Sequence, residues 1–287
     1  MNISLPALMA DKQLIGEEQE MSFLDHLEVL RWHVVRSVIA IIVASGFAFV
    51  YKNIVFDTIL FGPKKADFIT YRVLCKFSNK MSDLLPAFFP EGSICIGQNL
   101  PNLTNLTMAG QFSAHIMISL IAGLVIAFPY LLWEVWRFIK PGLKKEERNG
   151  ARGFVFFASL LFLTGVSFGY FMISPLSVNF LMNYQVSELV VNNPTLSTYN
   201  TLVTTIVLAC GGVFELPILV FFLTKLGLLS PKILRAFRKH AFVGALILSA
   251  VITPPDVFSQ VLVSIPIMIL YEVSIRISGM VVKKESK

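Results

Sequence analysis

The chain has 287 residues, of which 55% are hydrophobic and only 15% charged, and its mean hydropathy is +0.71. A soluble domain carries about 25% charged residues, so this composition excludes an ordinary soluble protein. The net charge of +6 does not indicate nucleic-acid binding, because the basic residues stand beside apolar runs, as they do at membrane interfaces.

The two ends of the chain differ in character from its middle. The first 22 residues are polar and acidic and contain no apolar core of the secretory type. We therefore expect a cytosolic N-terminal tail over residues 1–22, a membrane domain over 23–276 and a cytosolic C-terminal tail over 277–287.

Six apolar runs predict six transmembrane helices, since about 20 residues cross a hydrocarbon core of ~30 Å. The runs cover residues 34–51, 112–132, 153–187, 201–224, 241–252 and 257–271. The last two are short, which favours extra helical turns, local bilayer thinning or a re-entrant hairpin. Both ends of that hairpin face the same side in each case. The predicted fold class is an all-α, polytopic membrane protein.

The placement of Lys and Arg predicts the orientation. Basic residues are concentrated in 137–152, in 225–239 and after residue 275, whereas 174–198 contains none. Cytosolic loops carry the excess of Lys and Arg, so both termini are expected in the cytosol. A long outer loop of about 54–111 also holds basic residues, but the rule weakens for loops of that length.

Residues 165–169 read Gly-Val-Ser-Phe-Gly and match a nucleophile elbow. That motif requires a strand–turn–helix context, whereas here it lies in an apolar helix, where the two glycines also suit close helix packing. An intramembrane serine protease with Ser167 as nucleophile and His115 as base is one alternative that the sequence leaves open. No metal-ligand spacing and no phosphate-binding loop occurs in the sequence, so we predict neither a metal nor a cofactor, and no enzyme.

Glu215 is a carboxylate inside the fourth span, where it costs a few kcal/mol on insertion scales. We expect it to contact another transmembrane helix or to bind protons, unless it lies near a boundary and reaches water. Pro217 adds a polar spot by freeing a backbone group in the same turn. A proton-coupled secondary transporter is a second alternative, but the inverted repeats of that class do not show in the sequence.

Five short segments together resemble one protein family. They are His26-Leu27-x-x-Leu30-Arg31, Phe128-Pro129, Trp136-x-Phe138-Ile139-x-Pro141-x-Leu143 with Glu147-Arg148, Phe214-Glu215-x-Pro217, and the run 253–260 that reads Thr-Pro-Pro-Asp-Val-Phe-Ser-Gln. In this order, over residues 22–276, they resemble TatC, the multi-spanning core of the twin-arginine protein translocase.

The resemblance implies a receptor that binds signal peptides with paired arginines on folded cargo. Glu147 matches the family's carboxylate that meets the arginine pair, and Phe138, Pro141 and Arg148 would shape the same site. A guanidinium pairs with a carboxylate through two hydrogen bonds, which a lysine copies poorly.

One motif departs from the family pattern. The family reads His-Leu-x-Glu-Leu-Arg before the first span, with its second signal-peptide acid at the fourth position, where this chain has Val29. Glu28 stands one residue earlier, next to Leu30 and Arg31. Neighbours on a helix point about 100° apart, so whether Glu28 replaces the missing acid stays open.

The resemblance also implies the location and the partners. We expect a multi-pass protein of the bacterial inner membrane, forming homo-oligomers within a larger complex with single-span TatA/TatB-type subunits and driven by the proton-motive force. Glu215, Pro217, Asp256 and Gln260 match positions for partner contact or for the last hairpin, and Asp256 alternatively caps the last span.

The long outer loop contains Cys75 and Cys95. In an oxidising compartment the pair is a candidate disulfide, with two free thiols as the alternative. Cys210 lies in an apolar run, where packing is its expected role.

Overall fold

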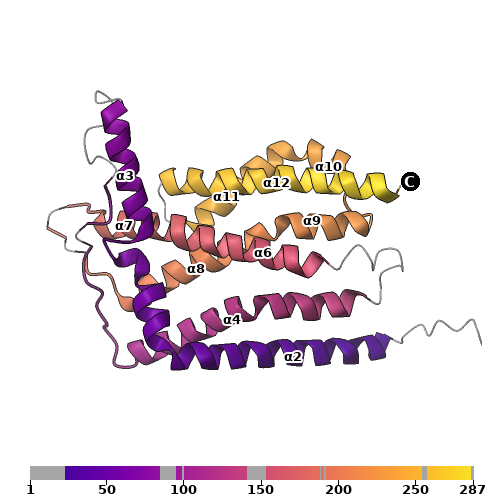
Figure 1. The fold of residues 1–287 in the computed structure, drawn as a ribbon, viewed down its shortest axis with the longest axis horizontal. Helices are drawn as coiled ribbons and strands as arrows, with labels where there is room; N and C mark the ends of the chain where they lie inside the picture. The colour runs from indigo at the N-terminus through magenta and orange to yellow at the C-terminus, as the bar shows by residue number, and fades with distance from the viewer. Residues whose placement is uncertain are drawn as a thin grey trace, which may run out of the picture.

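A computed structural model describes residues 23–84, 95–98, 100–140, 153–187, 189–190, 192–253 and 257–285. These residues are mostly helical (Figure 1). Their one strand-like pairing is an isolated bridge between Thr104 and Thr195. The predicted all-α fold is confirmed.

The first half of the described chain supplies two long helices with a shorter one between them. Its elements are α2 (Phe23–Val50), the π-helix η1 (Ile54–Leu60), the 3-10 turn η2 (Gly62–Lys64), α3 (Ile69–Leu84) and α4 (Gly110–Ile139). The second half contains α6 (Phe154–Phe168), the π-helix η4 (Gly169–Ile173), α7 (Ser174–Asn183), α8 (Leu196–Phe214), α9 (Leu216–Lys225), α10 (Pro231–Ala236), α11 (Arg238–Ile252) and α12 (Val257–Glu285).

Five helical segments in the described residues are long and apolar enough to cross a bilayer. They are Glu28–Val50, Gly110–Ile139, Phe154–Asn183, Leu196–Lys225 and Ser259–Lys283. With 15 residues, α11 spans only about 22 Å and is too short to reach across an average hydrocarbon core. The count of six crossings therefore stays a prediction, with α11 as the short fifth span.

The last helix is longer than its apolar run predicts. α12 has 29 residues and continues to Glu285, so the apolar run 257–271 covers only its first part; the boundary of a cytosolic tail at residue 277 stays a prediction. Contacts explain the extension. Tyr271 donates a hydrogen bond to the Leu234 carbonyl (2.8 Å), and the hydroxyls of Thr224 and Ser278 are 2.9 Å apart. These contacts fasten the polar half of α12 to α9 and α10.

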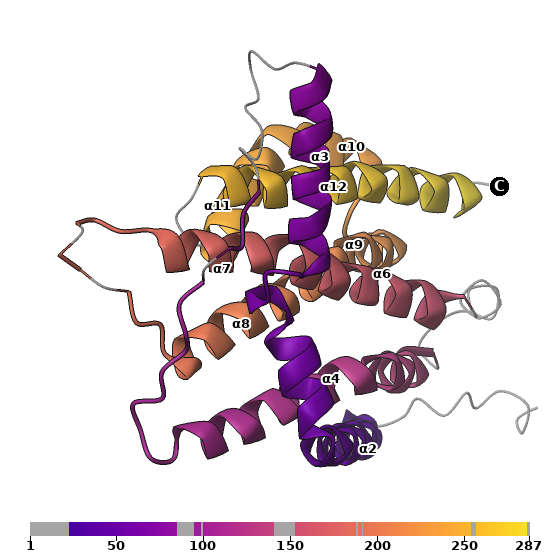
Figure 2. The same ribbon diagram turned by 60° about the vertical axis from the view of Figure 1, so that its left-hand side comes forward.

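The long loop between α2 and α4 is structured in its described part. In Figures 1 and 2, α3 stands across the ends of the other helices. A disulfide joins Cys75 of α3 to Cys95, whose Cα atoms are 4.4 Å apart. Tyr71 donates towards the carbonyls of Pro63 (2.7 Å) and Pro175 (2.9 Å), and burial raises its pKa well above the ordinary value. These bonds tie α3 to the bundle.

The two glycines of the Gly-x-Ser-x-Gly motif lie where α6 and η4 meet α8. A Cβ added at Gly165 would lie 2.7 Å from the Cys210 carbonyl oxygen and 2.7 Å from the Phe214 Cβ. At Gly169 it would lie 3.0 Å from the Cys210 Cβ. The motif therefore allows two helix backbones to approach closely, as small residues do in membrane proteins. Cys210 itself is buried in the apolar core around Ile206.

Candidate functional site

The pairing of α2 with α4 builds the candidate site. The two helices contact each other along their length and run antiparallel, because His33 near the start of α2 meets Glu134 near the end of α4, whereas Phe49 meets His115 at the other end. Gly123 allows the close approach, since a Cβ there would lie 2.7 Å from the Ser45 Cα. The first turns of α2 therefore lie beside the last turns of α4.

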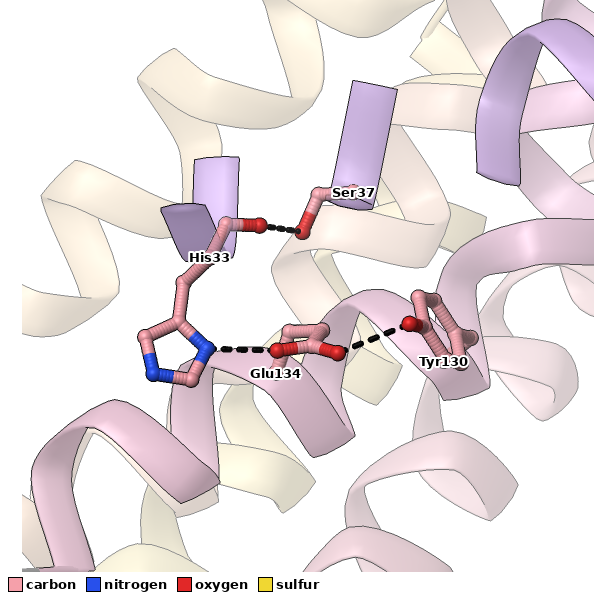
Figure 3. A network of polar contacts seen from close by, with 4 residues as sticks. All are labelled: His33, Ser37, Tyr130 and Glu134. Atoms are coloured by element: carbon pink, nitrogen blue, oxygen red, sulfur yellow. Dashed lines mark hydrogen bonds and ion pairs between the residues drawn. The ribbon is translucent and has the colours of Figure 1, made fainter. Parts of the chain in front are cut away.

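A polar network around the buried Glu134 connects these two helix ends (Figure 3). His33 Nδ1 lies 2.5 Å from Glu134 Oε2, and Tyr130 Oη donates to Glu134 Oε1 at 2.7 Å. Tyr130 and Glu134 are four residues apart and so share one face of α4. Ser37 donates to the His33 carbonyl at 2.9 Å, within α2.

The Glu134 side chain is 1% exposed, so its charge requires partners. Desolvating a carboxylate costs several kcal/mol unless hydrogen bonds and an opposite charge offset it. Both oxygens of Glu134 are bonded, and a carboxylate only accepts hydrogen bonds, so His33 carries its proton on Nδ1. Arg36 adds a further favourable charge interaction with Glu134. The network therefore fixes how α2 and α4 face each other.

Aromatic rings surround this network. The Phe138 ring stands edge-on to His33, with ring centroids 6.0 Å apart. Trp136 is buried and packs on Phe154 of α6 and on Phe222 of α9. The end of α4 is thus held on one side by α2 and on the other by α6 and α9.

The structure brings together only part of the residue set predicted for signal-peptide binding. Glu28, Leu30 and Arg31 are exposed on the first turns of α2, and Arg31 lies over the Trp32 ring at 5.7 Å. Phe138 lies one turn beyond Glu134 and contacts His33. The predicted residues Pro141, Glu147 and Arg148 lie outside the described residues.

Sequence reasoning missed the His33–Glu134 pair. A second span that ends at Leu132 leaves Glu134 outside the membrane helix, whereas α4 continues to Ile139. The available signal was the spacing of Tyr130 and Glu134, four residues apart and on the same helix face as apolar neighbours. The pairing itself depends on how α2 and α4 are rotated towards each other, and because His33 and Glu134 are 101 residues apart in the chain, no local sequence pattern encodes it.

The second predicted residue set lies around the break between α8 and α9. Glu215 stands at the junction, and Pro217 in the next turn is fully buried. One carboxylate oxygen of Glu215 is buried without a hydrogen-bond partner among the described residues. Gln260 donates to the Leu246 carbonyl at 3.2 Å and joins α12 to α11. Asp256 lies outside the described residues.

Ser167 and His115 have separate surroundings. The hydrogen bond of His115 goes to the Phe49 carbonyl (3.0 Å), and its ring stacks on the Phe49 ring at 3.8 Å. Ser167 is exposed and lines an apolar hollow of about 260 Å³ that does not include His115. Ser167 and His115 therefore do not share a site in which His115 could act as the base for Ser167. The described residues also hold no group of three or more potential metal ligands.

These observations define the class of the molecule. A chain whose described residues are mostly helical and include five segments able to cross a bilayer, and whose buried acid pairs with a neighbouring helix, is a multi-spanning membrane protein.

Comparison with known proteins gives the family. The family model described as Sec-independent protein translocase protein (TatC) matches residues 25–266. The chain is 41% identical to the TatC protein of Blattabacterium sp. subsp. Periplaneta americana, over 94% of this chain and 99% of the relative. It is 34% identical to that of Desulforapulum autotrophicum, over 90% and 84%. The chain therefore belongs to the TatC family.

Solved structures agree with this assignment. A crystal structure of the twin-arginine translocase receptor TatC in DDM is 32% identical and superposes with a TM-score of 0.66, over 88% of this chain and 99% of that one. A second crystal structure of that receptor gives 30% identity and a TM-score of 0.61. The family consists of bacterial inner-membrane translocase components rather than enzymes, and membership implies a complex with other translocase subunits.

Proposed function

We propose that this chain is the receptor of the twin-arginine translocase, which binds the paired-arginine signal peptides of folded proteins at the membrane face where α2 begins and α4 ends. The family match over residues 25–266 carries this proposal. In the proposed arrangement, both termini face the cytosol and the proton-motive force drives export.

The α2/α4 geometry supports a fixed receptor surface. Glu28 lies in the first turns of α2, and the segment with Glu147 follows α4 directly in sequence. The buried His33–Glu134 pair holds these two helices together near that end. An extended peptide that contacts both segments would meet a fixed spacing, and preorganisation of this kind lowers the entropic cost of binding.

Glu147 is the proposed ligand of the arginine pair, and Phe138, Pro141 and Arg148 complete its surroundings. Paired, bidentate hydrogen bonds of a guanidinium to a carboxylate favour arginine over lysine. Glu28, together with Leu30 and Arg31, is proposed as the second contact. Its exposure on α2 supports this, since an exposed carboxylate is free to meet a peptide.

Contact with single-span subunits is proposed at the α8–α9 break. A buried carboxylate oxygen of Glu215 without a partner among the described residues is costly in a membrane, and a polar group on a neighbouring transmembrane helix would satisfy it. Pro217, Asp256 and Gln260 are proposed to shape this region and the last hairpin.

Complementation tests the receptor function. In a strain that lacks this gene, a reporter with a twin-arginine signal should stay in the cytosol, and the wild-type gene should restore its export. Glu147→Ala should fail to restore export, because the guanidinium loses its carboxylate. Ser167→Ala should restore it fully.

The neighbouring acid provides a matched control. Glu146→Ala removes the same charge one position away and should keep most of the export. If Glu146→Ala abolishes export and Glu147→Ala does not, the assignment of Glu147 is wrong. If export does not depend on the gene at all, the receptor function is wrong.

A further inference from the structure

A partly polar pocket lies at the end of the α2/α4 pair opposite to the His33–Glu134 network. It has a volume of about 590 Å³, within the ~300–1,000 Å³ range of ligand pockets. His115 lies 19 residues before Glu134 on α4, which corresponds to about 28 Å along the helix axis. The pocket is therefore separate from the candidate receptor site. Its lining residues are Lys52, Asn53, Phe56, Asp57, Phe61, Leu103, Thr104, Asn105, Gln111, Phe112, His115 and Leu196.

The pocket carries one positive and one negative side chain that do not neutralise each other. The ion pairs found in the described part of the chain are His33–Glu134 and Arg238–Glu272, so Lys52 and Asp57 have no ionic partner there. Lys65 Nζ donates to the backbone carbonyl of Asp57 at 2.6 Å, which holds that residue in place and leaves its carboxylate available. Opposite charges that line one pocket without pairing match a zwitterionic ligand.

Aromatic packing makes one wall of the pocket rigid. The His115 ring is stacked on Phe49 (3.8 Å) and stands edge-on to Phe56 (5.5 Å). Its Nε2 lies 3.0 Å from the Phe49 carbonyl, and since a carbonyl only accepts, Nε2 carries the proton. His115 therefore joins the end of α2, the start of η1 and the first turns of α4 into a single wall.

Exposed apolar side chains lie beside the polar lining of the pocket. Phe112, which lines the pocket, is 63% exposed at the start of the span Gly110–Ile139, and Val50, two residues before Lys52, is 74% exposed at the end of the span Glu28–Val50. Exposed apolar residues at such a position face lipid tails. A ligand in this pocket would therefore have its polar group among Lys52, Asp57 and Gln111 and its apolar part in the bilayer.

We infer that this pocket binds the head group of a phosphatidylethanolamine lipid. The phosphate meets Lys52 and the amide of Gln111, and the primary ammonium donates to the Asp57 carboxylate. Charge-assisted hydrogen bonds of this kind are stronger than neutral ones. A phosphatidylcholine ammonium has no N–H to donate to Asp57. A phosphatidylglycerol head group has no cation, so its net negative charge is repelled by Asp57.

Native mass spectrometry of the purified full-length chain tests this inference. The protein is mixed with equal amounts of phosphatidylethanolamine, phosphatidylcholine and phosphatidylglycerol that carry identical acyl chains. Phosphatidylethanolamine should be retained about tenfold better than either competitor, a difference of about 1.4 kcal/mol. Equal retention of the three lipids would overturn the inference.

Two variants test the roles proposed for Lys52 and Asp57. Asp57→Asn should remove the preference for phosphatidylethanolamine over phosphatidylcholine, and Lys52→Gln should weaken the retention of both. Asp67→Asn and Lys76→Gln change the same charges at exposed positions outside the pocket and should behave like the wild type. If the pocket variants match these controls, the lipid binds elsewhere and the inference is wrong.

A competition experiment with a soluble analogue distinguishes a lipid ligand from a water-soluble ligand with the same polar group. Glycerophosphoethanolamine has the same polar group without acyl chains and should compete at least about tenfold more weakly, because burial of each lipid CH₂ adds about 0.8 kcal/mol. Equal competition would assign the pocket to a water-soluble ligand and overturn the assignment to a lipid.

Discussion

Glu134 shows how a membrane helix accommodates a charge that cannot reach water. Its two carboxylate oxygens are satisfied by His33 and Tyr130, each in a definite direction. A carboxylate that accepts from two donors at once fixes both side chains. One residue of α4 thereby determines the rotation of α2 about its own axis.

Removal of one partner should therefore destabilise the protein strongly. His33→Ala leaves the buried Glu134 carboxylate without one of its two hydrogen-bond donors, which costs about 1–3 kcal/mol and more when the group left behind is charged. Unfolding in detergent, followed by circular dichroism, should show this loss. Ser37→Ala, which removes only a hydroxyl bonded within α2, is the matched control and should change stability by about 1 kcal/mol or less.

A double variant separates the pair from its surroundings. His33→Leu with Glu134→Leu removes both partners at once and should be less destabilised than either single variant, because no carboxylate stays buried without its histidine partner. If His33→Ala unfolds like Ser37→Ala, the pair does not hold α2 to α4.

Among the elements, α6 and α8 depend on the absence of side chains where they meet. Gly165 lies against the Cys210 carbonyl and the Phe214 Cβ. A backbone oxygen cannot rotate away as a side chain does. Only the hydrogen atom of a glycine therefore fits at this position without a shift of the two helices.

Gly165→Ala should lower the free energy of unfolding by about 1–3 kcal/mol, the usual cost of overpacking a tight contact. Gly212 lies in the same helix pair with nothing within 4 Å of an added Cβ. Gly212→Ala should therefore be neutral or stabilising by up to about 1 kcal/mol, because alanine favours helix over glycine. Thermal unfolding in detergent measures both. Equal loss in the two variants would contradict close packing at Gly165.

The hairpin of α11 and α12 shows why its length was hard to predict. The apolar run ends near Tyr271, but α12 continues because Glu272 pairs with Arg238 (2.7 Å) and Ser278 bonds Thr224 (2.9 Å). Hydrophobicity locates the part of a helix that lies in lipid. The further residues of α12 contact other helices, and such tertiary contacts do not show in an apolar run.

At the scale of the whole molecule, much of the fold follows from the sequence. Four long apolar runs predicted four helices that the structure contains, and five motifs in order indicated the TatC family before any contact was known. The contacts between helices were not predictable in the same way. His33 and Glu134 lie 101 residues apart in the chain, and α3 is too polar for a span-based reading.

The candidate site was predictable only in part, and for a physical reason. Leu30, Arg31 and Phe138 were predicted from motif positions and Glu28 from its place beside the motif's missing acid, and their contact with a signal peptide stays a prediction. The buried carboxylate that fixes their spacing has no motif of its own. Its role appears only when the facing helix is placed beside it.

The orientation of the molecule is testable as a whole. In a chain with Cys75→Ser, Cys95→Ser and Cys210→Ala, a single cysteine is placed either in the loop between α7 and α8 (Ser187→Cys) or before α10 (Ser230→Cys). An impermeant maleimide added to intact spheroplasts should label the first and not the second, because the loops on the two sides differ in Lys and Arg. Both positions should react after lysis.

The reverse labelling pattern would place the termini outside. Labelling of both positions in intact spheroplasts would place both on the outer side and would show that the α8–α9 segment between them does not cross the membrane. A further cysteine at Lys287 should behave like the one at position 230, since six crossings return the chain to its starting side.

α2 runs without interruption from Phe23 to Val50, a straight length of about 42 Å at 1.5 Å per residue. Such a rod has no internal hinge, so a force on its first turns cannot be absorbed locally. Displacement of those turns therefore moves α2 as a unit against α4, which it contacts along its length. A displacement at the membrane surface where α2 begins is therefore transmitted along the helix to Lys52, just after the end of α2, at the other surface.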